Sequence, residues 1–161
     1  MIKYQNDLKI LIVEDNPGDF VIIENYLTEK IVTPQIKHVQ NFAETATLLT
    51  FNKDFDIILL DLTLPDKFGH DLITEILKIT DDIPVIALSG FTDMEFSIQS
   101  ISLGVSDYLF KNDLTAASLH KSIIYCLERK KRIHQVKESE KRYSELFRLN
   151  PQPIWIYDLE T

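Results

Sequence analysis

Three acidic residues directly follow two apolar runs in this chain. Residues 10–13 (Ile-Leu-Ile-Val) precede Glu14 and Asp15, and residues 57–60 (Ile-Ile-Leu-Leu) precede Asp61. Short aliphatic runs of this kind are typical of strands that are buried on both faces of a parallel sheet. Open α/β sheets bind ligands at the carboxyl ends of their strands. The three acids therefore predict a small acidic pocket, suited to a hard cation or to phosphoryl chemistry.

Two further side chains with useful chemistry follow the later apolar runs. Ser89 follows residues 84–88, and Lys111 follows residues 107–110. In a doubly wound sheet whose first strand is central, the ends of strands one, three, four and five meet at one edge. We therefore expect Ser89 and Lys111 to lie beside the three acids. Each residue alone is typical of an ordinary turn or surface, but their grouping on the strand ends favours a site.

These residue types can perform distinct tasks. Mg²⁺ prefers oxygen ligands, so Asp15 and Asp61 are candidate direct ligands and Glu14 is a candidate ligand through water. A carboxylate can also attack phosphorus and form an aspartyl phosphate. The Lys111 ammonium would offset the charge of the transferring group, and the Ser89 hydroxyl would donate a hydrogen bond to a phosphoryl oxygen.

Alternating strand and helix patterns surround these residues. Asn41 with Glu44, and Thr92 with Glu95, fit capping boxes, and Gly104 fits a left-handed C-terminal cap. Five strand–helix repeats predict an α/β fold, with a doubly wound parallel sheet covered by helices on both faces. Strands are predicted at 8–14, 35–40, 56–61, 83–88 and 106–110, and helices at 17–30, 42–52, 70–79, 93–103 and from about 113 onward.

The last helical pattern is longer than one small domain can cover. Residues 114–147 contain no Pro or Gly, and an apolar stripe with heptad spacing runs along them. Such a stripe needs a partner, so we expect a projecting helix that pairs with a second copy of itself. The alternative is a helix that breaks near residue 132 and folds back. The stripe consists of Cys126, Ile133, Val136, Tyr143 and Phe147, with Glu140 as its polar member.

Composition restricts the class of protein. The chain has 161 residues, 45% of them hydrophobic and 26% charged, which is enough for one folded domain with a little left over. The sequence shows no apolar stretch of membrane-spanning length and no secretory signal, and Cys126 is its single cysteine. We therefore expect a soluble, cytoplasmic protein with no membrane partner and no internal disulfide.

The net charge of −8 is unevenly distributed. Residues 1–120 carry 19 acidic and 8 basic side chains, so this part would repel a nucleic-acid backbone, and we expect no nucleic-acid partner. The basic residues at 129–132 are typical of the solvated face of an exposed helix.

Four ordered motifs resemble the receiver domain of bacterial two-component response regulators. They lie at residues 12–16, 60–66 with Gly69, 84–90 and 104–111, and the resemblance spans about 7–130. It implies a flavodoxin-like fold with strand order 2-1-3-4-5. It also implies a signalling switch that is not a dedicated enzyme. A histidine kinase or histidine phosphotransfer protein would donate a phosphoryl group in a Mg²⁺-dependent reaction, and the last strand and C-terminal helix would relay the change.

The resemblance assigns a role to each acid. Asp61 would be the phosphoacceptor and a metal ligand, and Glu14 and Asp15 would be the pair that binds Mg²⁺. The backbone carbonyl of Thr63 would be a further metal ligand. In this assignment the three acids belong to one site for metal binding and phosphoryl transfer.

The resemblance also assigns the remaining site residues. Ser89 would be the switch hydroxyl, Lys111 the phosphate-binding lysine and Tyr108 the switch aromatic whose rotamer follows Ser89. One position departs from the family pattern, because Asn112 follows the lysine where many receivers have proline.

The end of the chain resembles the start of a PAS sensory domain, at residues 142–147 and 150–158. We therefore expect a receiver domain at 1–130, a coiled-coil-like signalling linker at 131–147 and the start of a PAS domain at 148–161. The full-length protein would then be longer, for example a hybrid histidine kinase.

Three other functions fit parts of the pattern. A haloacid-dehalogenase-type phosphatase also uses a strand-end aspartate, but it places a second Asp two residues later, where this chain has Thr63. A receiver-like binding module that is never phosphorylated would not need the complete acid set and Lys111. A DNA-binding regulator would need an output domain, and the residues after Lys130 show no helix-turn-helix pattern.

Overall fold

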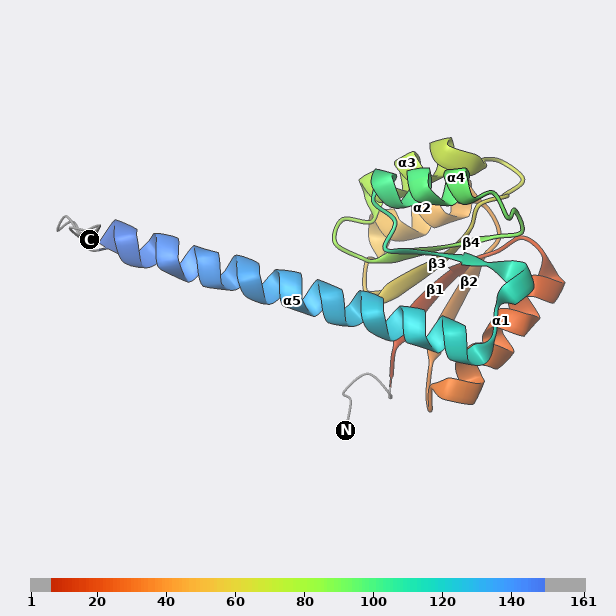
Figure 1. The fold of residues 1–161 in the computed structure, drawn as a ribbon, viewed down its shortest axis with the longest axis horizontal. Coiled ribbons are helices and arrows are strands. Elements are labelled where there is room, and N and C mark those ends of the chain that lie inside the picture. Colours follow the sequence, from red (N-terminus) through yellow and green to blue (C-terminus); the bar gives the residue numbers. More distant parts are fainter. Residues whose placement is uncertain (1–6, 150–161) are drawn as a thin grey trace, which may run out of the picture. The chain divides into compact units, whose positions relative to one another are not determined.

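The computed structural model describes residues 7–149 of the chain. Five parallel strands form one sheet in the order β2-β1-β3-β4-β5 (Figure 1). This arrangement confirms the predicted fold class and strand order, and the strand ends lie within two residues of their predicted positions. The strands are β1 Lys9–Val13, β2 Gln35–Val39, β3 Ile57–Asp61, β4 Val85–Ser89 and β5 Asp107–Phe110.

Helices cover both faces of the sheet because alternate strand residues point to opposite faces. On one face, Leu11 and Val13 of β1 belong to the cluster that includes residues of α2 and α3, and on the other face Ile10 and Ile12 join residues of α1 and α5. Figure 1 shows α2, α3 and α4 on one side and α1 with the start of α5 on the other. The helices are α1 Pro17–Lys30, α2 Phe42–Phe51, α3 Gly69–Ile79, α4 Met94–Leu103 and α5 Ala116–Leu149.

Side-chain caps start the helices near the predicted positions. The Asn41 side chain accepts a hydrogen bond from the Glu44 amide, as predicted. The capping box at Thr92 is wrong, because Asp93 is the N-cap of α4 and accepts from the amide of Glu95. Asp93 also accepts from the amide of Phe96, so the helix begins one residue later than a cap at Thr92 would place it. Gly104 ends α4 with φ of 122°, in the left-handed region that the sequence predicted.

The C-terminal helix α5 continues without interruption from Ala116 to Leu149, so the predicted alternative of a break near residue 132 is wrong. The chain divides into two compact units, one ending at Glu128 and one beginning at Arg129. Cys126 is buried in the core of the first unit and therefore does not belong to an exposed stripe. Among residues 7–149, no helix combines the length and apolar content that crossing a membrane requires.

Candidate functional site

Glu14, Asp15 and Asp61 form an acidic cluster at the carboxyl edge of the sheet. Asp61 is the last residue of β3, and Glu14 directly follows β1. One carboxylate oxygen from each of the three residues lies within 4.8 Å of those from the other two. Glu14 is fully buried and Asp61 is 4% exposed, whereas Asp15 is exposed. The structure therefore brings together the three acids that the sequence pointed to.

Lys111 directly follows β5 and places its ammonium among these acids. Its Nζ lies 2.7 Å from Glu14 Oε2, 3.1 Å from Asp61 Oδ2 and 2.9 Å from Asp19 Oδ2. Asp19 lies in the first turn of α1 and is a site contact that was not predicted from the sequence. The sequence does contain a signal for Asp19, because the first turn of a helix that follows a strand lies at the same edge of the sheet as the end of that strand.

The electrostatic balance of the cluster is reflected in two pKa values. Burial, with a smaller contribution from the charge of Asp61, raises the pKa of Glu14 to about 7 against the opposing effect of its hydrogen bond with Lys111. Burial lowers the pKa of Lys111, but its hydrogen bonds to Asp19 and Glu14 outweigh burial and leave the pKa above its ordinary value. Lys111 is therefore charged at neutral pH. An additional cation beside Glu14 would favour its ionised form.

The backbone around Glu14 is held by contacts that the sequence did not indicate. His38 Nε2 lies 2.7 Å from the Glu14 carbonyl oxygen, and because a carbonyl only accepts, this nitrogen carries the proton. The His38 ring stacks on Phe20, with 3.8 Å between ring centroids. The Asn16 amide donates to Glu14 Oε1 at 3.1 Å. His38 and Asn16 therefore hold Glu14 at its backbone carbonyl and at its carboxylate, and Phe20 supports the His38 ring.

Ser89 lies on β4, which pairs with the strand that carries Asp61, and Tyr108 lies on β5, the strand on the far side of β4. Ser89 is fully buried, and its Oγ accepts a hydrogen bond from the Phe91 amide at 3.0 Å. Tyr108 is 8% exposed, and its ring packs edge-on against Phe96 and Phe110. The Tyr108 hydroxyl is buried and has no hydrogen-bond partner within residues 7–149. Burial raises the pKa of Tyr108, and the nearby Ser89 hydroxyl partly opposes this shift.

Thr63 lies two residues after Asp61, at the start of the loop that leads to α3. Its amide donates to Asp61 Oδ1 at 3.1 Å, so the loop backbone is joined directly to the acidic cluster. On the other side of the site, residues Lys111–Asp113 form a short 3₁₀ turn. Asn112 lies in this turn, at the position where many receivers have proline.

Comparison with known proteins identifies the family. The family model of the response regulator receiver domain matches residues 10–124. The chain belongs to the response regulator receiver family. The matched residues include the acidic cluster and Lys111, so the family assignment covers the whole candidate site.

Several proteins of known description resemble this receiver domain. The transcriptional regulatory protein KdpE of Staphylococcus aureus is 40% identical over 106 residues, which are 64% of this chain and 43% of that protein. The two-component response regulator ORR24 of Oryza sativa is 34% identical over 108 residues, 65% of this chain and 16% of that protein. The chain therefore matches less than half the length of these relatives.

Solved structures share the fold of this receiver domain. A response regulator receiver domain from Clostridium thermocellum has a TM-score of 0.68 and 28% identity, over 78% of this chain and 98% of that one. The receiver domain of a signal transduction histidine kinase from Syntrophus aciditrophicus has a TM-score of 0.63 and 28% identity, over 74% of this chain and 89% of that one.

The acidic cluster of this receiver domain fits a hard divalent cation. The three converging groups offer only carboxylate oxygens, which Mg²⁺ prefers to nitrogen or sulfur. The buried Glu14 has a raised pKa, so the cluster favours added positive charge. The exposed position of Asp15 leaves one side open to water, which Mg²⁺ retains in its coordination shell.

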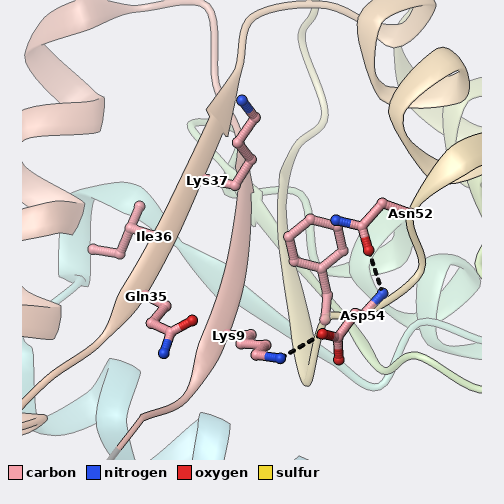
Figure 2. Close-up of a pocket in the computed structure, with 7 residues that line it drawn as sticks. Lys9, Gln35, Ile36, Lys37, Asn52 and Asp54 are labelled. Atoms are coloured by element: carbon pink, nitrogen blue, oxygen red, sulfur yellow. Dashed lines mark hydrogen bonds and ion pairs between the residues drawn. The ribbon is translucent and has the colours of Figure 1, made fainter.

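A hollow of about 300 Å³ lies away from the acidic cluster, at the opposite edge of the sheet, beside the amino ends of β1 and β2. Figure 2 shows the Lys9 ammonium directed at Asp54, and these two side chains form an ion pair. Lys37 extends away from this pair (Figure 2). Because Lys9 and Asp54 neutralise each other, this hollow offers less unbalanced charge to a ligand than the acidic cluster does.

Proposed function

We propose that this chain is a phosphorylation-dependent signalling switch in which Asp61 accepts a phosphoryl group. The observation that carries the proposal is the position of the Lys111 ammonium, 3.1 Å from Asp61 and 2.7 Å from Glu14 at one edge of the sheet. The Lys111 cation thus contacts the acceptor carboxylate and Glu14, and a carboxylate oxygen of Asp15 lies within 4.8 Å of one from each of these two acids. Phosphoryl transfer requires this combination, because two anionic groups must approach each other.

In the proposed reaction, a carboxylate oxygen of Asp61 attacks the phosphorus of a phosphohistidine. The new oxygen–phosphorus bond forms as the nitrogen–phosphorus bond breaks, and the imidazole leaves with a proton from water. Lys111 offsets the negative charge on the transferring group. Bound Mg²⁺, held by Glu14, Asp15, Asp61 and the Thr63 carbonyl, would supply further charge neutralisation and orientation of the phosphoryl oxygens.

The switch itself rests on Ser89 and Tyr108. A phosphoryl group on Asp61 would offer an acceptor oxygen to the Ser89 hydroxyl, which now accepts from the Phe91 amide. Movement of Ser89 would change the space beside Tyr108, whose hydroxyl has no hydrogen-bond partner among the described residues. The change then passes along β5 toward α5. A single added charge biases a two-state element in this scheme.

The proposed phosphodonor is a histidine kinase or a histidine phosphotransfer protein. The proposed domain organisation is a receiver at 1–130, a helical linker at 131–147 and the start of a PAS domain at 148–161. Residues 150–161 of the PAS motif lie outside the described residues. A receiver domain from a histidine kinase is among the similar structures, which is compatible with a hybrid kinase.

A homodimer through the second half of α5 is a separate part of the proposal. Ile133, Val136, Tyr143 and Phe147 recur at heptad spacing and are each more than half exposed. Exposed apolar side chains at this spacing are typical of one strand of a coiled coil. We expect light scattering to show a dimer of the full chain and a monomer for Val136→Asp. Gln135→Asp, outside the apolar stripe, is the matched control and should remain a dimer. Dissociation of both variants, or of neither, would contradict dimerisation through the apolar stripe.

Beryllofluoride, a phosphoryl mimic, tests the switch directly. With Mg²⁺, we expect it to change the NMR signals of Ser89, Tyr108 and Lys111 in the wild type and to leave those of Asp61→Asn unchanged. A receiver-like binding module that is never phosphorylated would show no Mg²⁺-dependent response in either protein. That result would contradict the proposed function.

A further inference from the structure

The N-terminus of α2 is capped by a residue from the loop that follows Asp61. Asp66 Oδ1 accepts a hydrogen bond from the Phe42 amide, and Asp66 Oδ2 accepts one from the Ala43 amide, both at 2.9 Å. These are the first two amides of the helix, which have no partner within it. A carboxylate also interacts favourably with the positive end of a helix dipole. Asp66 therefore holds two elements together that are distant in the sequence.

A cation reinforces the same junction. Lys67 Nζ lies 4.3 Å from the centroid of the Phe42 ring, and Phe42 is the first residue of α2. A cation over the face of an aromatic ring is attracted by the ring quadrupole. Two consecutive loop residues, Asp66 and Lys67, thus contact the same end of one helix.

The loop that carries Asp66 is a small hairpin. Thr63 pairs with Phe68 as an antiparallel bridge, and the Gly69 amide donates to the Leu62 carbonyl at 2.9 Å. At the tip, the Leu64 amide donates to the Lys67 carbonyl at 3.1 Å. Asp66 lies at the tip of this hairpin and Thr63 lies at its base. Holding the tip therefore restrains the base.

The base of the hairpin is part of the proposed metal and phosphoryl site. The Thr63 amide donates to Asp61 Oδ1, and the Thr63 carbonyl is the proposed backbone ligand for Mg²⁺. We propose that Asp66 is a positioning residue, which anchors the acceptor loop to α2 and thereby holds the Thr63 carbonyl in place for the metal. This inference rests on the proposed function, because it deepens the account of the same site.

The alternative role of Asp66 is a helix cap with no effect on the site. The chain contains a matched control, because α2 has a second cap at the same end. Asn41 Oδ1 accepts from the amide of Glu44, the third residue of α2, at 2.8 Å. Asn41→Ala removes a cap from α2 without releasing the hairpin, whereas Asp66→Ala removes a cap and releases the hairpin. A role in helix capping alone predicts the same behaviour for both variants.

The first measurement needs no metal. In the full chain without Mg²⁺, amide hydrogen exchange reports the opening of the hairpin through the Gly69 amide. We expect Asp66→Ala to speed this exchange about tenfold or more, with Asn41→Ala within about twofold of the wild type. Asp66→Asn keeps one side-chain oxygen as an acceptor, so its Gly69 exchange rate should lie between the rates of these two variants. Equal exchange of Gly69 in Asp66→Ala and Asn41→Ala would overturn the proposed anchor.

The second measurement is the Mg²⁺ affinity of the same proteins, determined by NMR titration. We expect Asp66→Ala to weaken Mg²⁺ binding about tenfold, the lower end of the range that is common for residues that orient a metal ligand. Asn41→Ala should bind Mg²⁺ as the wild type does. Equal affinities in the two variants would overturn the link to Thr63. Neither measurement involves phosphoryl transfer, so a wild type that binds Mg²⁺ but is never phosphorylated would contradict only the proposed function.

Discussion

Lys111 Nζ lies 3.1 Å from Asp61 Oδ2, so the residue that directly follows β5 contacts the last residue of β3. The same nitrogen contacts Glu14, which is fully buried. A single cation thus connects the proposed phosphoacceptor with a proposed metal ligand.

Removing the Lys111 charge should destabilise the protein when no metal is present. Lys111→Met leaves the buried Glu14 without its cation, and we expect the free energy of unfolding to fall by about 2–3 kcal/mol at pH 8. Urea unfolding with a chelator measures this loss, and millimolar Mg²⁺ should recover part of it. Lys9→Met is the control, because its ion pair with Asp54 is exposed and should matter much less. Equal losses in the two variants would contradict the account.

Ser89 should be needed for the response to phosphorylation more than for phosphorylation itself. We expect Ser89→Ala to bind beryllofluoride at Asp61 but to lose most of the accompanying change in the Tyr108 NMR signals, because the hydroxyl that would move is absent. Ser89→Thr keeps the hydroxyl and should keep the response. An undiminished Tyr108 response in Ser89→Ala would exclude Ser89 as the switch.

Removing the Tyr108 hydroxyl should cost little stability in the unphosphorylated protein. Within residues 7–149 this hydroxyl is buried without a hydrogen-bond partner. Tyr108→Phe should therefore change the free energy of unfolding by less than about 0.5 kcal/mol or raise it by about 1 kcal/mol. Denaturant unfolding provides the measurement, with the exposed Tyr125→Phe as control. A loss of more than about 1 kcal/mol would indicate a hydrogen bond to the Tyr108 hydroxyl.

The contribution of Asp66 to stability should depend on pH. Burial raises the pKa of Asp66, but the hydrogen bonds from the Phe42 and Ala43 amides outweigh burial and lower it below the ordinary value of 3.8. A lowered pKa in the folded state stabilises the fold above pH 3.8, and this stabilisation is lost as the pH falls through the lower folded value. We expect wild type to exceed Asp66→Asn in stability at pH 7 and the difference to shrink below about pH 4.

Unfolding curves of both proteins from pH 3 to pH 7 would measure this dependence. Asn41→Ala serves as the control, since it removes a neutral cap and its cost should not change with the ionisation of a carboxylate at that position. A difference between wild type and Asp66→Asn that stays constant across this range would contradict the role of the charged form.

The strand ends could be predicted from the sequence because each follows a short aliphatic run. A parallel topology places such ends at one edge, so Glu14, Asp15, Asp61 and Lys111 were expected to meet, and their contacts agree with that expectation. The helix continuing past residue 132 was likewise expected from the absence of Pro and Gly.

The contacts between elements could not be predicted in the same way. Asp19 and His38 reach the site from α1 and β2, and Asp66 reaches α2 from the hairpin tip. All three side chains could equally have faced solvent. Which direction they take depends on packing between elements that local patterns do not specify. The displacement of the α4 cap from Thr92 to Asp93 has a similar cause, because both residues are good caps and the loop geometry selects one.

The most direct test of the central claim is the mass of the protein after incubation with Mg²⁺ and acetyl phosphate. The account predicts that the wild type gains one phosphoryl group, that a chelator prevents the gain and that Asp61→Asn gains none. Absence of the gain in the wild type, or an equal gain in Asp61→Asn, would contradict the assignment of Asp61 as the phosphoacceptor.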